Sequence, residues 1–425
     1  MHYFEYKGGF LHCEEVPLVR LAEEVGTPLY VYSHRTLTRH FRVFDEAFSE
    51  VPHLVCFSMK SLSNLAILRL FANLGGGLDI ASGGELFRGL RAGVPADRIV
   101  FAGVGKSEGE MEYALREGIL MFNVESEEEL ETLEGLAGRL GKKARVALRV
   151  NPDVDPRTHP YIATGLRMSK FGMDIRGAIE EYRKAAGLPH LRVEGVHCHI
   201  GSQITQSGPF VDALGRLVKL VGRLRAEGIP IRYLNLGGGL GITYKDEAPP
   251  HPAELARDLL PLVRGLDCTL LFEPGRVIVG NAGILLTRVL YTKRTDAKRF
   301  FIVDAAMNDL IRPSLYDSYQ EILPVEEGAQ ERPSEVADVV GPICESGDFL
   351  AKDRKLPEFH QGDLLAVMSA GAYGFTMSSN YNSRPRAAEV LVKDGDYCVV
   401  RRRESYEDLV RGEEVPGFLL GEMPR

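Results

Sequence analysis

The feature that most constrains the fold is a regular alternation of short apolar runs with longer amphipathic segments, beginning near residue 53. The apolar runs predict buried strands, and the segments between them, with apolar residues three and four apart, predict helices. Eight such units over about 220 residues predict a closed parallel (β/α)8 barrel, because these barrels close at that number and size. An open doubly wound sheet is the alternative. The strands are expected at 53–58, 77–82, 98–103, 119–124, 144–150, 193–200, 232–237 and 269–274.

Two parts of the chain depart from this rhythm. Residues 151–175 are too long for a simple connection, which predicts an active-site lid or a mobile flap. After residue 281 the helical period largely disappears, and runs such as "RFFIVD" and "AAEVLVK" predict a second, mostly antiparallel β domain. We therefore expect a barrel over 33–280 and a β-rich domain made of 1–32 and 281–425, with the run "PLYVYS" a candidate to join its sheet.

Composition excludes several classes of protein. Hydrophobic residues make up 44% of the 425 residues and charged residues 26%, as in soluble globular enzymes. A net charge of -8 disfavours a nucleic-acid partner, since phosphate backbones require clustered Lys and Arg. No stretch approaches the roughly 18 apolar residues of a membrane helix. The start lacks a signal peptide's pattern, and six scattered cysteines without a CxxC pair indicate neither a disulfide framework nor a zinc site, so we expect a cytoplasmic protein.

Unusual polar residues stand at the ends of the predicted strands. In a barrel the carboxyl ends of the strands form the active site, so we expect these residues to converge. Lys60 follows the first strand and could be a surface lysine. Partly desolvated at the barrel mouth, however, it would have a lowered pKa and form an imine with an aldehyde. Further along lie Asp79, His197, His199, the glycines of "NLGGGLG" (235–241) and the run "EPGR" (273–276).

These residue types suit one cofactor in particular. The glycine run is either a flexible turn or a loop whose bare amides bind phosphate. Glu273 either satisfies buried amides or holds a proton on a heteroaromatic nitrogen, and Arg276 can reach phosphate or carboxylate. His197 and His199 are two apart and point to the same side of a strand, but no acidic ligand completes a metal site, so no metal is expected. Lysine, phosphate loop, carboxylate and a histidine to stack on a ring together describe a pyridoxal phosphate site.

At this point the sequence resembles a known family over nearly its whole length. It is similar to the diaminopimelate decarboxylases, pyridoxal phosphate enzymes of the alanine racemase and ornithine decarboxylase fold. The resemblance rests on "FSMKSLSN", "GLDIASGGEL", "HCHIGSQI", "NLGGGLG", "EPGR", "GPICESGD" and "GAYGFTMSSNYNSRPRAAEVLV", in that order and at matching intervals. One departure is visible next to the lysine, where the family usually has "YAxKAN" and this chain has Phe57, Ser58, Ser61 and Leu62.

The resemblance implies a role for each matching residue. Lys60 would carry the cofactor, His199 would stack on its ring, Glu273 would pair with the ring nitrogen, and Asp79 would belong to the same cofactor-binding set. Cys344 or Lys60 would return a proton to the reacting carbon. The phosphate would be held by Ser202, Gly237, Gly238, Gly239, Gly275, Arg276 and Tyr373. The substrate would contact Arg276, Arg312, Tyr316, Glu345 and Tyr373, with Cys344 and Glu345 donated by the second subunit of a homodimer.

The implied activity is decarboxylation of meso-2,6-diaminopimelate to L-lysine and CO2, the last step of lysine biosynthesis. A racemase of this fold is expected to place an arginine beside the ring nitrogen, so Glu273 favours decarboxylation. The alternatives are a decarboxylase of ornithine, lysine or carboxynorspermidine, and a catalytically inactive cofactor-binding relative. An oxidoreductase is disfavoured, because Asp258 stands at about the distance of a ribose-binding acid but no GxGxxG precedes it.

Overall fold

A computed structural model describes residues 1–156 and 170–420 and contains a closed barrel of parallel strands. Each barrel strand pairs with the next along the chain, including β8 with β9, and the last strand, β13, pairs with the first, β5, which closes the ring. The closed barrel is therefore confirmed, and the open sheet is wrong. The barrel strands are β5 (His53–Ser58), β6 (Gly77–Ile80), β7 (Ile99–Phe101), β8 (Met121–Val124), β9 (Ala144–Asn151), β11 (Leu191–His197), β12 (Tyr233–Asn235) and β13 (Thr269–Phe272).

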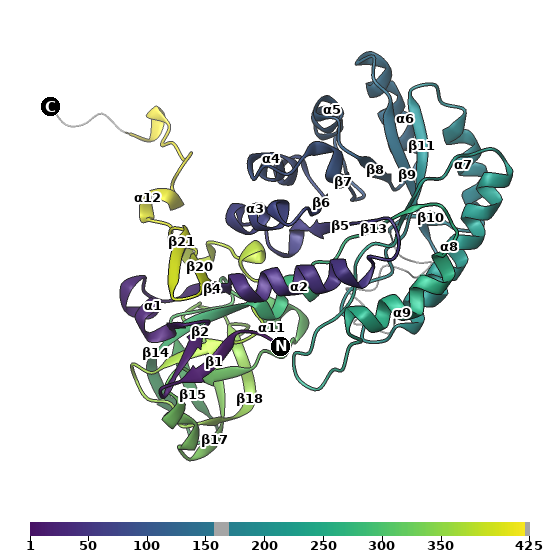
Figure 1. The fold of residues 1–425 in the computed structure, drawn as a ribbon. Coiled ribbons are helices and arrows are strands. Elements are labelled where there is room, and N and C mark those ends of the chain that lie inside the picture. Colours follow the sequence, from purple (N-terminus) through teal and green to yellow (C-terminus); the bar gives the residue numbers. More distant parts are fainter. Residues whose placement is uncertain (157–169, 421–425) are drawn as a thin grey trace.

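Helices cover the outside of the barrel (Figure 1). They begin at local signals in the sequence: Ser126 caps α6, whose first turn carries three glutamates and whose last turn carries Arg139, an order that suits the helix dipole. Their apolar faces pack on the strands. The helices are α2 (His34–Ala47), α3 (Leu65–Asn73), α4 (Gly83–Arg91), α5 (Glu108–Glu117), α6 (Glu127–Arg139), α7 (Ala178–Ala186), α8 (Gly208–Ala226), α9 (Pro252–Val263) and the short α10 (Arg276–Val279).

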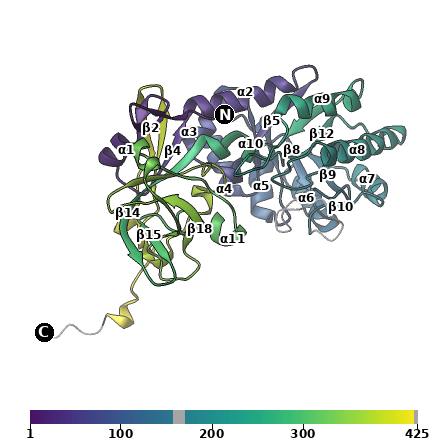
Figure 2. The ribbon, with the colours of Figure 1, turned by 90° about the horizontal axis from the view of Figure 1, so that it is seen from below.

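The rest of the chain forms a mostly antiparallel β domain beside the barrel, as Figure 2 also shows. Its strand order is β18-β17-β15-β14-β4-β20-β21. In addition β19 pairs with β14 and β16 pairs with β19, and among these strands β15–β17 and β4–β20 are the parallel pairs. The strands are β4 (Leu29–Ser33), β14 (Gly283–Arg294), β15 (Arg299–Val303), β16 (Ile322–Pro324), β17 (Ser334–Val340), β18 (Phe349–Pro357), β19 (Leu364–Val367), β20 (Ala388–Lys393) and β21 (Asp396–Arg401). The helix α11 (Arg312–Tyr316) also belongs to this part.

The N-terminal segment is split between two sheets. β4, from the run "PLYVYS", lies between β14 and β20 in the middle of the large sheet. In Figure 1 this purple strand stands among green and yellow ones. The preceding residues instead form a separate three-stranded sheet of β1 (Phe4–Lys7), β2 (Phe10–Cys13) and β3 (Val16–Pro17). Among the described residues, no helix combines the length and apolar character needed to cross a bilayer.

The long connection after β9 is only partly described. A short strand, β10 (Met173–Asp174), pairs in parallel with Val150 and Asn151 at the end of β9. Residues 157–169, the centre of the predicted lid, lie outside the described residues.

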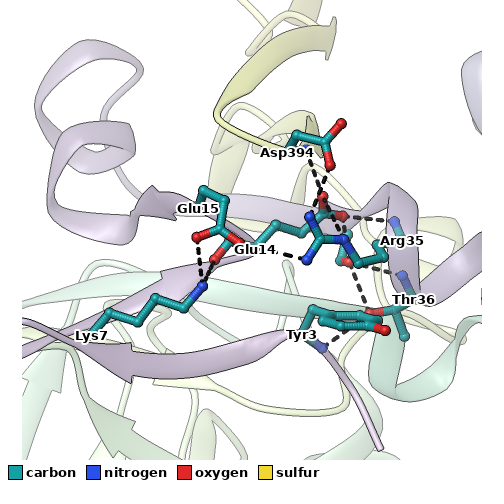
Figure 3. A network of polar contacts seen from close by, with 8 residues as sticks. Tyr3, Lys7, Glu14, Glu15, Arg35, Thr36 and Asp394 are labelled. Carbon is teal, nitrogen blue, oxygen red and sulfur yellow. Dashed lines mark hydrogen bonds and ion pairs between the residues drawn. The ribbon is translucent and has the colours of Figure 1, made fainter.

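A buried carboxylate near the N-terminus connects the small N-terminal sheet, the turn between β20 and β21, and the start of α2 (Figure 3). Glu14 is 2% exposed and accepts hydrogen bonds from Ser33 Oγ (2.7 Å), from the Arg35 amide (2.7 Å) and from the Asp394 amide (2.6 Å). Ser33 caps α2, and Asp394 lies in the turn between β20 and β21. One side chain thus connects the N-terminal sheet, the start of α2 and the C-terminal hairpin.

We expect Glu14→Gln to lower the free energy of unfolding by about 2 kcal/mol, because an amide has only one accepting oxygen for these three donors. Urea unfolding of the full chain measures the change. The neighbouring Glu15 provides the matched control. It forms exposed ion pairs with Lys7 and Arg35, which solvent screens, so Glu15→Gln should leave the free energy of unfolding almost unchanged. Equal destabilisation by the two variants would contradict this role for Glu14.

Candidate active site

A cavity of about 610 Å3 lies at the carboxyl ends of the barrel strands, where α11 and the loop carrying Tyr373 reach over from the β domain. Most of the predicted site residues meet there. Those that line the cavity are Lys60, His199, Ser202, Gly239, Glu273, Gly275, Arg276, Arg312, Tyr316 and Tyr373. Convergence at this end of the barrel is the arrangement expected of an active site in such a fold.

Lys60 lies in a short 3-10 turn directly after β5 and faces a buried acid. Its Nζ is 3.5 Å from Asp79 Oδ2, and Asp79, 2% exposed, also accepts a hydrogen bond from Ser58 Oγ (2.8 Å). Asp79 therefore contacts the Lys60 ammonium group but does not itself line the cavity.

The predicted lowering of the Lys60 pKa is wrong for this structure. Burial would lower the pKa of Lys60, but the electrostatic influence of Asp79 and Tyr373 outweighs it and raises the pKa above the ordinary lysine value. The side chain also keeps 47% of its surface exposed, so desolvation is incomplete. Burial, together with the nearby charge of Glu273, raises the pKa of Asp79.

Glu273 follows β13 at the centre of the barrel mouth and is held as an anion. Asn235 Nδ2 (2.7 Å) and Asn123 Nδ2 (3.2 Å) donate to its Oε1, and His197 Nε2 lies 3.4 Å from its Oε2. Burial would raise the pKa of Glu273, but the neighbouring His197 and Lys60 lower it well below the usual range. An ionised carboxylate with fixed orientation thus points into the cavity.

His199 and the glycine run form one wall. β11 ends at His197, so His199 lies in the loop beyond the strand, where its Nδ1 accepts a hydrogen bond from the Gly238 amide (3.2 Å). Burial, and after it the charge of Lys60, lowers the pKa of His199, which favours the neutral ring. A neutral ring is well suited to stacking on an aromatic cofactor.

Packing requires the glycines that follow β12. A Cβ at Gly238 would overlap the carbonyl oxygen of Glu273, and one at Gly239 would overlap that of Gly201. Gly239 also has φ +120°, which other residues rarely adopt. The Gly237 amide donates to Asn235 Oδ1 (2.9 Å) and the Gly238 amide to His199, so of the three it is Gly239 that lines the cavity.

Two arginines surround one phenol at the side of the cavity nearest the β domain. Arg276 and Arg312 both donate to Tyr244 Oη, and a second nitrogen of Arg276 donates to Ser202 Oγ (3.0 Å). Arg276 also lies over the ring of Tyr373, with its guanidinium carbon 4.9 Å from the centroid. Within the described residues the buried Nε of Arg276 has no hydrogen-bond partner, so this guanidinium retains a donor for a ligand.

The two residues assigned to a partner subunit are not at the cavity of their own chain. Cys344 and Glu345 are exposed and do not line it, although the Cys344 amide is fixed by Asn382 Oδ1 (2.8 Å). Their predicted roles therefore stay predictions. Nor do the described parts of the chain contain a group of three or more His, Cys, Asp or Glu side chains that could hold a metal ion.

Sequence reasoning missed several residues that shape the site. Asn123 and Asn235 each stand near the end of a strand, a placement that could have marked them as inward-facing. Arg149 forms a buried ion pair with Glu125 (2.6 Å). Arg149 lies near the end of β9, and Glu125 directly follows β8. Tyr244, in the loop after "NLGGGLG", carried no signal of its own.

The donor set matches what pyridoxal phosphate requires. A primary amine, an ionised carboxylate, a glycine amide and a guanidinium with a spare N–H all border one cavity. The amine can bind an aldehyde, the carboxylate a pyridine nitrogen, and the amide and guanidinium a phosphate.

Comparison with known proteins agrees with this geometry. Residues 34–280 match the family model "Pyridoxal-dependent decarboxylase, pyridoxal binding domain". The diaminopimelate decarboxylase of Vibrio cholerae is 54% identical, with 98% of this chain and 99% of that protein covered.

Solved structures give the same result. The diaminopimelate decarboxylase from Helicobacter pylori complexed with L-lysine has a TM-score of 0.89 and 43% identity, covering 93% of this chain and 98% of that one. The enzyme from M. jannaschii, in co-complex with L-lysine, has a TM-score of 0.93 and 38% identity, covering 98% of each chain. The chain therefore belongs to the diaminopimelate decarboxylases of the pyridoxal-dependent decarboxylase family.

Proposed function

We propose that this chain uses pyridoxal phosphate to decarboxylate meso-2,6-diaminopimelate to L-lysine and CO2, the last step of lysine biosynthesis. The observation that carries the proposal is the ionised, doubly hydrogen-bonded Glu273, which shares a cavity with Lys60 and with the arginines Arg276 and Arg312. The names of the relatives, and the L-lysine bound by two of the structural neighbours, support the same substrate and product.

The cavity residues divide between the two ends of the cofactor. Lys60 would bind its aldehyde carbon, Glu273 its ring nitrogen and His199 a face of its ring. Its phosphate would be held by Gly239, Ser202, Gly275, Arg276 and Tyr373, with Gly237 and Gly238 shaping that loop. When bound, pyridoxal phosphate supplies an electron-accepting ring that stabilises the carbanion left by CO2.

Glu273 has a defined task in this chemistry. A carboxylate beside the ring nitrogen keeps a proton on that nitrogen, because the negative charge stabilises the protonated form. Asn123 and Asn235 fix the orientation of the Glu273 carboxylate, so its negative charge would stay directed at the ring nitrogen that carries the proton. After CO2 leaves, Cys344 or Lys60 would return a proton to the substrate carbon.

Diaminopimelate carries a second amino acid group, which needs a cation for its carboxylate and an anion for its ammonium. Arg276 and Arg312 supply the positive charges, Tyr316 and Tyr373 line the same space, and Glu345 would supply the negative charge from the partner subunit. Decarboxylases of ornithine, lysine or carboxynorspermidine lack this second carboxylate contact or place it differently, and the names of the close relatives favour diaminopimelate.

The direct test measures CO2 release from meso-diaminopimelate, ornithine and lysine side by side, with added pyridoxal phosphate. We expect diaminopimelate to be decarboxylated far faster than the other two. A faster reaction with ornithine or lysine would replace this proposal with the alternative decarboxylase, and no reaction with any of them would favour an inactive cofactor-binding protein.

We further propose that the enzyme is a cytoplasmic homodimer with shared sites. In this arrangement the barrel, residues 33–280, binds the cofactor. The β domain, residues 1–32 and 281–425, completes the substrate site through Arg312 and Tyr373 and contributes to the dimer interface. The exposed position of Cys344 and Glu345, outside their own cavity, supports donation to a partner. All six cysteines lie in described residues and are free thiols, which suits a reducing compartment.

Mixing two inactive variants tests the shared site. Lys60→Ala and Cys344→Ala chains should each be inactive, but a heterodimer contains one site with both residues intact. Random reassortment of equal amounts should therefore restore about a quarter of wild-type activity. Size-exclusion chromatography with one tagged chain confirms exchange. If chains exchange and activity stays absent, Cys344 and Lys60 serve the same chain's site.

A further inference from the structure

Tyr244 occupies an unusual position between two positive charges. Its phenol oxygen accepts a hydrogen bond from Arg276 Nη1 (2.7 Å) and another from Arg312 Nη1 (2.6 Å). The side chain lines the cavity but is only 9% exposed. Both guanidinium groups also lie against its ring, with their central carbons 5.7 Å and 4.6 Å from the ring centroid.

The phenol joins arginines from the two halves of the molecule. Arg276 follows β13 in the barrel, whereas Arg312 begins α11 beside the β domain. Two positively charged guanidinium groups repel each other at short distance. The Tyr244 oxygen, which accepts a hydrogen bond from both, therefore stabilises the short distance between them. Their charges outweigh the effect of burial and lower the pKa of Tyr244, which agrees with an oxygen that carries partial negative charge.

The loop that carries Tyr244 is itself fixed. Glu247 Oε2 accepts hydrogen bonds from the Tyr244 amide (2.9 Å) and the Lys245 amide (2.7 Å), and Thr243 Oγ1 donates to the Glu247 carbonyl (2.7 Å). The backbone on either side of the tyrosine is thus held in a tight turn. A phenol on such a rigid support can determine where two longer, more flexible side chains stand.

We propose that Tyr244 is a positioning residue that holds Arg276 and Arg312 at a set spacing, so that one binds the cofactor phosphate and the other the distant carboxylate of the substrate. This assignment rests on the proposed function. In a Tyr244→Phe variant the arginines lose their common acceptor. Arg276 keeps Ser202 as a partner. Arg312 loses the hydrogen bond to Tyr244, the one that its guanidinium makes within residues 1–156 and 170–420.

The test compares Tyr244→Phe with Tyr233→Phe, a half-buried tyrosine at the opposite end of β12, in the full-length enzyme. Losing a hydrogen bond to a charged group should raise the KM for meso-diaminopimelate about 10- to 100-fold, with a smaller change in kcat. Affinity for pyridoxal phosphate, followed by absorbance, should fall about tenfold, while affinity for pyridoxal, which has no phosphate, should not change. Tyr233→Phe should match the wild type in all three measurements.

Three results separate the possibilities. A KM for Tyr244→Phe within about twofold of the control would overturn the proposal. Equal losses of affinity for pyridoxal and pyridoxal phosphate would also overturn it, because they would indicate a general packing defect. If the wild type itself releases no CO2 from diaminopimelate, the proposed function fails, and the comparison of the two cofactor forms still decides the role of Tyr244 in phosphate binding.

Discussion

Lys60→Ala should remove the yellow absorbance of the lysine-bound cofactor and reduce turnover by roughly a thousandfold or more. The reason is positional. Lys60 is the lysine at the end of β5, where Asp79 holds its Nζ, and Lys245, which also lines the cavity, comes from a different loop and lies against Tyr319. Among the residues that the structure describes, Lys60 is the lysine paired with Asp79.

Absorbance spectra of the purified variant, with and without added pyridoxal phosphate, measure the effect. Lys245→Ala is the matched control, since it removes the other cavity lysine and should leave the colour in place. Colour that survives in Lys60→Ala, and that borohydride still fixes covalently to the protein, would show that a different amine carries the cofactor.

Glu273→Gln should keep the cofactor bound and slow decarboxylation by about 100-fold, or ~3 kcal/mol in the activation barrier. A neutral amide cannot hold a proton on the ring nitrogen by charge. Its oxygen can still accept from Asn123 and Asn235, so the local structure should remain. The variant thus separates the charge of this side chain from its shape.

Steady-state kcat at saturating cofactor and substrate provides the measurement, and the cofactor's dissociation constant confirms that binding is retained. Glu194→Gln is a suitable control, because Glu194 is a buried carboxylate on β11 that does not line the cavity. Unchanged kcat in Glu273→Gln would mean that the reaction does not depend on a protonated ring nitrogen held by this residue.

The barrel could be predicted because each of its strands carries its own signal. Apolar runs bounded by turn residues gave all eight positions, and the errors are confined to strand ends, where pairing with neighbours decides the limit. The end of β11 at His197 is one example. In the β domain β18 carries a weaker signal, because its sequence, "FLAKDRKLP", has charged residues at its centre, and its pairing with β17 contains register shifts.

The site could be predicted where a residue type is unusual for its place, as with Lys60, Glu273 and the glycine run. The electrostatics could not, because they depend on charges from other strands. Asp79 of β6 reaches Lys60 just after β5, and His197 of β11 reaches Glu273 just after β13. Neither distance is present in the sequence. Tyr244 escaped notice for the same reason, since its two arginine partners are far away along the chain.

The position of β4 has a consequence for how the chain is made. This strand is synthesised before the barrel, yet its partners β14 and β20 are synthesised after it. At ~5–20 residues per second, a ribosome needs on the order of tens of seconds to complete the intervening chain. Throughout that interval both edges of β4 lack their native partners, so the large sheet can be completed only after the whole barrel has been synthesised.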